Sequence, residues 1–216
     1  MKESAKAKLF SFRYFVFDFI KLTGAIPTLI WLRPKRIYAG EVAKRRIRGG
    51  ALVIANHSAF IDPLYVMTAI WYRRVRFVFS EELARSRAGG FFRACGCMEI
   101  DRQNPTLGSF KQITDALKGG EVVTIFPEGH LSGENGDAFK SGAVLMALRS
   151  GVPIVPLYIC PRKMAFGRLK VVFGEAVDIR EIYGERPTFA QIGEATKLLY
   201  ERQTALRERF SDTLHA

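Results

Sequence analysis

The sequence predicts an α/β domain in which helices flank a mixed, largely parallel β-sheet. Short apolar runs, among them residues 51–55, 121–126 and 154–159, alternate with longer stretches whose apolar residues recur at helical spacing. Such alternation of strands and helices is typical of an α/β sandwich. The chain has 216 residues, of which 48% are hydrophobic, so it matches the size of one such domain with a substantial core.

The pattern predicts the elements in the following order. We expect strands at residues 51–55, 75–79, 98–100, 121–126, 154–159 and 169–173. We expect helices over residues 63–70, 81–94 with a break at Gly89-Gly90, 109–117 and 141–149, with glycines at 119, 120 and 151 as stop signals. A long C-terminal helix should pack against the domain, because one helical stripe holds Phe189, Ile192, Thr196, Leu199, Gln203, Leu206 and Phe210.

The N-terminal residues 1–36 are expected to associate with a membrane, and residues 37–216 to form one domain. The stretch from Leu9 to Leu32 is rich in aromatic and aliphatic residues, but Asp18 and Lys21 interrupt it and a break at Gly24/Pro27 follows. A spanning helix needs about 20 mostly apolar residues, so two short amphipathic helices at the membrane interface fit better. The charges also disfavour a signal peptide. A helix packed on its own domain is the alternative.

The charge of the chain calls for an anionic partner. The net charge is +12, and residues 33–48 hold seven basic residues against one acid, Glu41. Nucleic acid and an anionic membrane surface both suit such a patch. The apolar segment before it favours the membrane, so we expect a membrane-associated protein on the cytoplasmic side and no nucleic-acid partner. The three cysteines, Cys95, Cys97 and Cys160, are expected to be reduced thiols.

His57 and Asp62 are the first candidate catalytic residues. They stand in the segment NHSAFIDP, directly after the apolar run 51–55. A neutral imidazole can take a proton at pH 7, and a carboxylate beside it can hold its tautomer and stabilise the imidazolium. Five helical steps would separate the side chains by about 140°. We therefore expect His57 in a turn, with Asp62 as the N-cap of the next helix and Pro63 as its first residue.

A second run of polar residues follows another predicted strand. The apolar run 121–126 leads directly into Pro127-Glu128-Gly129-His130. Ligands of open α/β sheets bind outside the carboxyl ends of the strands, so both segments should reach one crevice. The alternative is structural: Asp62 would only cap a helix, and His57 would be a hydrogen-bonded turn residue.

These segments resemble the hallmarks of the glycerolipid acyltransferase family, the 1-acylglycerol-3-phosphate acyltransferases and their relatives. The hallmarks are HxxxxD, here in NHSAFIDP, and FPEG, here at residues 126–129. Two weaker blocks occur in the same order, with residues 96–102 between the hallmarks and residues 152–158 after them. The resemblance covers most of the chain after about Ile37, which it identifies as the acyltransferase domain.

The resemblance implies acyl transfer from an acyl thioester, carried by acyl carrier protein or coenzyme A, to the hydroxyl of a lysophospholipid. The acceptor it favours is 1-acylglycerol-3-phosphate, which would give phosphatidic acid. His57 would remove the acceptor proton and Asp62 would orient the imidazole. Backbone N–H groups near Gly129 would assist the oxyanion, and Glu128 would hold the acceptor. No metal ion and no cofactor besides the thioester co-substrate are expected.

One departure from the family leaves the acceptor open. Most members follow FPEG with a threonine and an arginine, and that arginine is associated with the phosphate of the acceptor. This chain reads His130-Leu131-Ser132 there. Arg102 and Lys140 remain as cations for a phosphate. Acyl transfer to an acceptor without a phosphomonoester is therefore one alternative function.

Two functions of other classes also fit the residues. A metal-dependent hydrolase would gather a divalent ion with His57, Asp62, Glu128 and His130. A basic module that binds membrane or nucleic acid without catalysis would need neither His57 nor Glu128.

Overall fold

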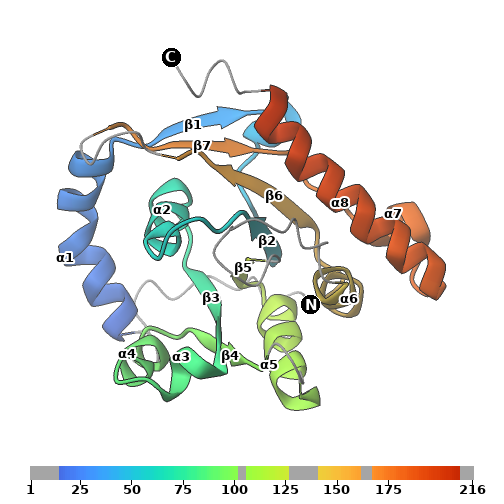
Figure 1. Ribbon diagram of the computed structural model, residues 1–216, viewed down its shortest axis with the longest axis horizontal. Coiled ribbons are helices and arrows are strands. Elements are labelled where there is room, and N and C mark those ends of the chain that lie inside the picture. The colour runs from blue at the N-terminus through green and yellow to red at the C-terminus, as the bar shows by residue number, and fades with distance from the viewer. Residues whose placement is uncertain (1–14, 102–105, 127–140, 162–166, 210–216) are drawn as a thin grey trace, which may run out of the picture.

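The chain folds into helices packed on both faces of one sheet (Figure 1). The structure is a computed structural model, and it describes residues 15–101, 106–126, 141–161 and 167–209. In these residues seven strands form the sheet: β1 Lys35–Tyr38, β2 Ala51–Ala55, β3 Val75–Ser80, β4 Met98–Ile100, β5 Val122–Ile125, β6 Ile154–Ile159 and β7 Lys170–Phe173. The strand order is β1-β7-β6-β2-β5-β3-β4.

The strand directions confirm a mixed, largely parallel sheet. Every neighbouring pair is parallel except β6 and β7, which are antiparallel. The pair β7 and β1 therefore runs against the other five strands. The register of β2 aligns Leu52 with Val123 of β5 on one side and with Ile154 of β6 on the other. β2 is thus the middle strand, and its carboxyl end opens between those of β5 and β6.

Helices cover both faces of the sheet. The described helices are α1 Phe15–Leu32, the 3-10 helix η2 Val42–Lys44, α2 Asp62–Ala69, α3 Glu81–Arg85, α4 Gly89–Ala94, α5 Leu107–Lys118, α6 Gly142–Ser150, α7 Ile179–Tyr183 and α8 Phe189–Arg209. Figure 1 shows α1 and α2 on one side of the sheet and α5, α6 and α8 on the other. The sheet is therefore buried on both faces.

The central strand explains why the sequence 51–55 is apolar without alternation. Leu52 and Ile54 pack into the core beneath α5, α6 and α8. The odd-numbered residues Ala51, Val53 and Ala55 pack into the opposite core, beside α2. All five residues are fully buried. A strand that is covered on both faces has no polar side, which produces the continuous run.

α1 corrects the prediction of two short helices. It runs as one helix from Phe15 to Leu32, through both Gly24 and Pro27. A proline inside a helix removes a backbone hydrogen bond and costs about 3 kcal/mol in an isolated helix. Tertiary contacts offset this cost at both ends of α1. Near its start Asp18 accepts two hydrogen bonds from Arg74, at 2.7 and 2.6 Å, and at its end Leu32 is fully buried.

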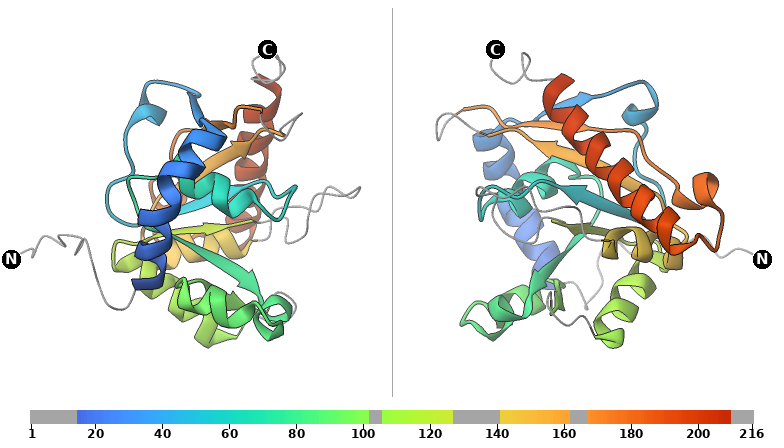
Figure 2. Two further views of the ribbon diagram at one scale, coloured as in Figure 1. Left: turned by 90° about the vertical axis from the view of Figure 1, so that its left-hand side faces the viewer. Right: turned by 45° about the vertical axis from the view of Figure 1, so that its right-hand side comes forward.

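The packing of α1 agrees with the alternative of a helix docked on its own domain. α1 lies against α2, as both views in Figure 2 indicate. Its outward face nevertheless carries the exposed side chains of Phe15, Phe19, Leu22 and Ile30. At about 100° per residue these four fall within an arc of about 80°. Among the described helices none is both long enough and apolar enough to cross a bilayer.

Three elements were absent from the prediction. β1, η2 and α7 are short, and β1 and η2 lie within the basic run 33–48, whose charges hide their pattern. The boundary expected between residues 36 and 37 falls inside β1, and the division into two parts stays a prediction. The predicted strands occur within one or two residues of their observed bounds.

The C-terminal helix α8 follows the predicted stripe only in part. Leu199, Gln203 and Leu206 are buried against the sheet, as expected. Phe189 corrects the prediction, because it is the first residue of the helix and is 91% exposed. Phe210 lies outside the described residues.

The glycine pair 89–90 also differs from its predicted role. The chain breaks at residues 86–88, and Gly89-Gly90 begin α4 instead of ending a helix. α3 and α4 approach so closely here that a Cβ atom on Gly89 would lie 1.9 Å from the carbonyl oxygen of Ala84. A Cβ atom on Gly90 would meet nothing within 4 Å. Only the first glycine is therefore required by packing.

This difference makes the two glycines a matched pair for a stability test. We expect Gly89→Ala to lower the free energy of unfolding by about 1–3 kcal/mol through overpacking. Gly90→Ala should leave it unchanged or raise it by up to about 1 kcal/mol, because alanine favours a helix. Urea unfolding followed by circular dichroism measures both variants. Equal effects of the two substitutions would contradict the close approach of α3 and α4.

Candidate active site

His57 lies just beyond the carboxyl end of β2, where Asn56 fixes the path of the chain. The side-chain amide of Asn56 donates to the carbonyl of Ile159 at 3.0 Å, and its oxygen accepts from the Ile159 amide at 2.7 Å. This pair ties the end of β2 to the end of β6 and leaves Asn56 buried. Asn56 was not among the residues predicted for the site. The sequence signal that could have pointed to it is an amide side chain directly after an apolar strand.

Asp62 holds the turn that carries His57. Its Oδ2 atom accepts hydrogen bonds from the backbone amides of Ser58, at 2.7 Å, and Ala59, at 2.8 Å. The same oxygen lies 3.1 Å from Nδ1 of His57. The Asp62 side chain is 1% exposed and the His57 side chain 17%. The predicted juxtaposition of His57 and Asp62 is therefore present in the structure.

The role of Asp62 in the helix differs from the prediction. Ile61 occupies the N-cap position of α2, and Asp62 is the first helical residue, followed by Pro63. Its carboxylate points back to the preceding turn instead of capping the amides of its own helix. The purely structural alternative expected the Asp62 carboxylate to cap α2. That expectation is wrong, because the carboxylate contacts the turn before the helix.

The contacts of Asp62 define the tautomer of a neutral His57. Two amides already donate to Oδ2, and a carboxylate oxygen accepts but does not donate. The hydrogen between the two side chains is therefore carried by Nδ1 of His57. In a neutral ring this leaves the lone pair on Nε2, the nitrogen that can take up a proton.

Phe126 brings the second motif to the same place. β5 is the parallel neighbour of β2, and Phe126 follows its carboxyl end. Its ring stacks on the ring of His57, with centroids 4.3 Å apart and planes 24° apart. The strand that leads into Pro127 therefore ends at His57, as expected for one crevice. Glu128, Gly129 and His130 themselves lie outside the described residues, as do Arg102 and Lys140.

Aromatic side chains form an apolar border beside the pair. Phe60, in the turn between His57 and Asp62, is 71% exposed. Its ring lies 6.3 Å from that of Phe92 in α4, and Phe92 in turn contacts Phe79 at the end of β3, at 5.6 Å. The exposed ring of Phe60, backed by these two rings, suits an acyl chain better than a polar substrate.

The described cysteines are poor nucleophiles. All three are free thiols. Burial raises the pKa of Cys97 to about 11 and that of Cys160 to about 12, and it also raises the pKa of Cys95. The thiolate is the reactive form, and at neutral pH these thiols are almost fully protonated. The thiols therefore offer no ready acceptor for an acyl group.

The described residues contain no group of three or more His, Cys, Asp or Glu side chains that could hold a metal ion. Two of the four residues that the metal alternative requires, Glu128 and His130, lie outside those residues. His57 and Asp62, the other two, contact one another directly.

An imidazole beyond a strand end, in contact with a buried carboxylate on an α/β fold with helices on both faces of the sheet, is the arrangement expected of an enzyme that uses acid–base catalysis. The chain matches the acyltransferase family over residues 35–160, more than half of its length, and it belongs to that family. It is accordingly an O-acyltransferase by family. The matched residues include β1, β2 with His57 and Asp62, and the strands β5 and β6 that border them.

Relatives with names of this class are similar to much of the chain. The 1-acyl-sn-glycerol-3-phosphate acyltransferase of Bacillus subtilis is 28% identical over 166 residues, which cover 74% of this chain and 82% of the relative. The enzyme of the same name from Streptococcus pneumoniae is 30% identical over 138 residues, 61% of this chain and 51% of the relative. The chain thus spans about half of this second relative.

A solved structure shares the fold. The 1-acyl-sn-glycerophosphate acyltransferase of Thermotoga maritima superimposes with a TM-score of 0.61 at 21% identity. The match covers 96% of this chain and 83% of the Thermotoga chain. At this identity the likeness supports the fold, and the residues of the site have to be argued from their own geometry.

Proposed function

We propose that this protein transfers a fatty acyl group from an acyl thioester to the free hydroxyl of 1-acylglycerol-3-phosphate, giving phosphatidic acid. The names of the relatives support the reaction. The observation that carries the assignment to this site is the contact of His57 Nδ1 with the buried carboxylate of Asp62. The thioester is carried by acyl carrier protein or by coenzyme A.

His57 acts as the general base in this proposal. Nε2 removes the proton of the acceptor hydroxyl while its oxygen attacks the thioester carbonyl carbon. The new carbon–oxygen bond forms and the carbonyl electrons move to the oxygen, which backbone N–H groups near Gly129 stabilise. When the oxyanion collapses, the carbon–sulfur bond breaks, and the imidazolium returns the proton to the departing thiol. Asp62 stabilises the imidazolium through its contact with Nδ1.

Direct transfer without an acyl-enzyme is consistent with the described thiols. Cys97 and Cys160 have pKa values raised to about 11 and about 12, so a thiolate attack at neutral pH would be slow. One imidazole that alternates between base and acid serves both halves of the reaction.

Replacing His57 tests the mechanism. We expect His57→Ala to lower turnover by about 10² to 10⁴ fold, the usual contribution of positioned proton transfer. Phosphatidic acid formed from acyl thioester and 1-acylglycerol-3-phosphate is measured by mass spectrometry. Asp62→Asn should also lower turnover, because an amide cannot stabilise an imidazolium as a carboxylate does.

Two controls accompany this test. Cys160→Ala should keep near-normal turnover, because its thiol takes no part in the proposed reaction. Activity should persist in excess chelator, whereas a metal-dependent reaction would stop. If a folded His57→Ala protein has the same turnover number as the wild type, His57 is not the general base.

Arg102 is the proposed contact of the acceptor phosphate. It falls within a family block, and arginine grips a phosphate with two parallel hydrogen bonds. We expect Arg102→Ala to raise the KM for 1-acylglycerol-3-phosphate far more than the KM for the acyl donor, and Arg102→Lys to restore it only in part. The comparison acceptor is a monoacylglycerol, which has no phosphate. Equal wild-type activity on both acceptors would reject a phosphate-specific site.

We also propose that the exposed face of α1 lies in the membrane interface on the cytoplasmic side, where the acceptor lipid is found. Phe19, Leu22 and Ile30 are more than half exposed on one face of α1. Exposing several apolar side chains to water is unfavourable, and moving them into the headgroup region of a membrane lowers the free energy. The net charge of +12 adds attraction to anionic lipids.

Replacing these three residues together by serine should weaken sedimentation with phosphatidylglycerol vesicles at least about tenfold. The matched control replaces three apolar residues elsewhere that are also more than half exposed, Leu107, Ile182 and Phe189, by serine and should bind normally. High salt should release the wild type only in part, because salt screens charge but not apolar insertion. Complete release by salt, or equal losses in both triple variants, would contradict an α1 anchor.

A further inference from the structure

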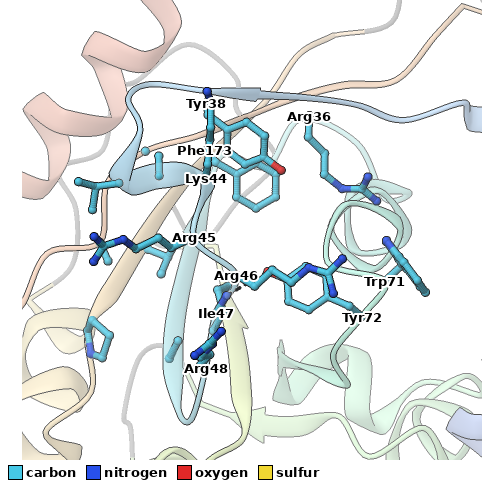
Figure 3. A pocket seen from close by; sticks show the side chains of 17 residues that line it. Arg36, Tyr38, Lys44, Arg45, Arg46, Ile47, Arg48, Trp71, Tyr72 and Phe173 are labelled. Carbon is cyan, nitrogen blue, oxygen red and sulfur yellow. Dashed lines mark hydrogen bonds between the residues drawn. The ribbon is translucent and has the colours of Figure 1, made fainter.

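A cavity of about 370 Å³ lies at the edge of the sheet opposite to His57. Figure 3 shows side chains from β1, from the segment 42–48 and from the residues after α2 arranged around it. Ala51, the first residue of β2, lines the cavity, whereas His57 follows the other end of that strand. The five residues of β2 that separate the two places span about 15 Å. The cavity is therefore separate from the candidate active site.

The lining of the cavity is strongly basic. None of the described residues that line it carries a carboxylate, and their cations are Arg36, Lys44, Arg45, Arg46 and Arg48. Two acids stand close by in the chain. Glu41 pairs with Lys44 at 2.5 Å, and the carboxylate of Glu175 lies beside Gly40. The cations still outnumber these neighbouring acids by five to two, so the cavity favours an anion.

Hydrogen bonds hold the walls of the cavity in place. Arg36 donates to the carbonyls of Thr68 and Ala69 at the end of α2, at 3.1 and 2.7 Å. The backbone amide of Ile47 donates to the hydroxyl of Tyr72 at 3.2 Å. These contacts fasten β1 and the segment 42–48 to the end of α2. A site fixed in this way loses little conformational entropy when a ligand binds.

Further contacts orient the basic segment itself. Arg73 donates to the carbonyls of Ile47 and Gly49, at 2.9 and 2.8 Å. The guanidinium of Arg46 lies over the ring of Tyr72, 5.2 Å from its centroid. Stacking leaves the N–H groups at the rim of the guanidinium able to donate to an anion.

The cavity combines this charge with apolar surface. Trp71 is 49% exposed and Val42 is 50% exposed, and both line the cavity together with Phe173. Tryptophan and cations side by side are typical of surfaces that meet lipid headgroups. Trp71 also follows α2, the helix against which α1 packs. Nucleic acid is disfavoured, because one local cavity offers no extended basic groove for a phosphate backbone.

We propose that this cavity binds the phosphate of an anionic phospholipid headgroup, with its basic side chains donating to the phosphate and Trp71 contacting the apolar part of the lipid. The site goes beyond the proposed acyl transfer, because it lies at the other end of β2 and contains none of the catalytic groups. A lipid held here orients the protein on the membrane surface without occupying the active site.

Trp71 provides the readout, because the chain has only two tryptophans and Trp31→Phe leaves Trp71 alone. Its fluorescence is titrated with dihexanoylphosphatidylglycerol below the concentration at which this lipid forms micelles. We expect a saturable change in fluorescence. The double substitution Arg46→Ala and Arg48→Ala should weaken binding by about tenfold or more, since it removes two charge-assisted donors.

The matched control removes two charges elsewhere. Arg85→Ala and Lys111→Ala, on exposed faces of α3 and α5, should change the affinity less than about twofold. Dihexanoylphosphatidylcholine, which has the same chains and no net charge, should bind at least about tenfold more weakly. Equal losses of affinity in both double variants would mean that the lipid is attracted by the overall charge and not by the cavity, and would overturn the proposal.

Three other outcomes would also overturn the lipid site. They are the absence of a saturable change, inorganic phosphate that binds as tightly as the lipid, and an oligonucleotide that binds more tightly. Acyl transfer is assayed in parallel on the Arg46 and Arg48 variant with soluble short-chain acceptor. Retained turnover together with lost lipid binding supports the cavity, and failure of the His57 mechanism leaves this result unaffected.

Discussion

The carboxylate of Asp62 is the constraint on which the site depends. One oxygen of a side chain that is 1% exposed accepts from two backbone amides and contacts the imidazole of His57. A buried anion is stable only when donors surround it, so the turn 57–59 is held in the conformation that supplies them. The same requirement sets the direction of the imidazole. The burial of the charge, the geometry of the turn and the proposed proton transfer thus all depend on one arrangement.

Much of the fold could be predicted because its central strands are buried and therefore consist of apolar residues. β2 is apolar at every position, since both of its faces are covered. β1 could not be predicted in this way, because Lys35 and Arg36 belong to an edge strand that solvent reaches. α1 was predicted to break at Gly24 and Pro27, for local propensity argues for a break there. Contacts with residues far along the chain, Arg74 above all, decide otherwise.

The candidate site was predictable where chemistry and spacing coincide, as for His57 and Asp62. The direction of the Asp62 carboxylate was not, because capping by an aspartate and a bond back to the preceding turn leave the same sequence pattern. Asn56 was missed for a related reason. Its two bonds to Ile159 join residues 103 positions apart, and no local pattern encodes such a contact. The positions of Arg102, Glu128, Gly129 and Lys140 stay predictions.

The ion pair between Asp18 and Arg74 means that α1 is not an exchangeable module. A membrane anchor that is only tethered could be cut off or replaced by another hydrophobic segment, and the enzyme would remain intact. Here removal of the helix would take away the Asp18 carboxylate that Arg74, itself only 25% exposed, contacts, and would expose the core around Leu32. Loss of attachment and loss of folding would then be inseparable. The helix proposed to contact the membrane therefore also stabilises the domain.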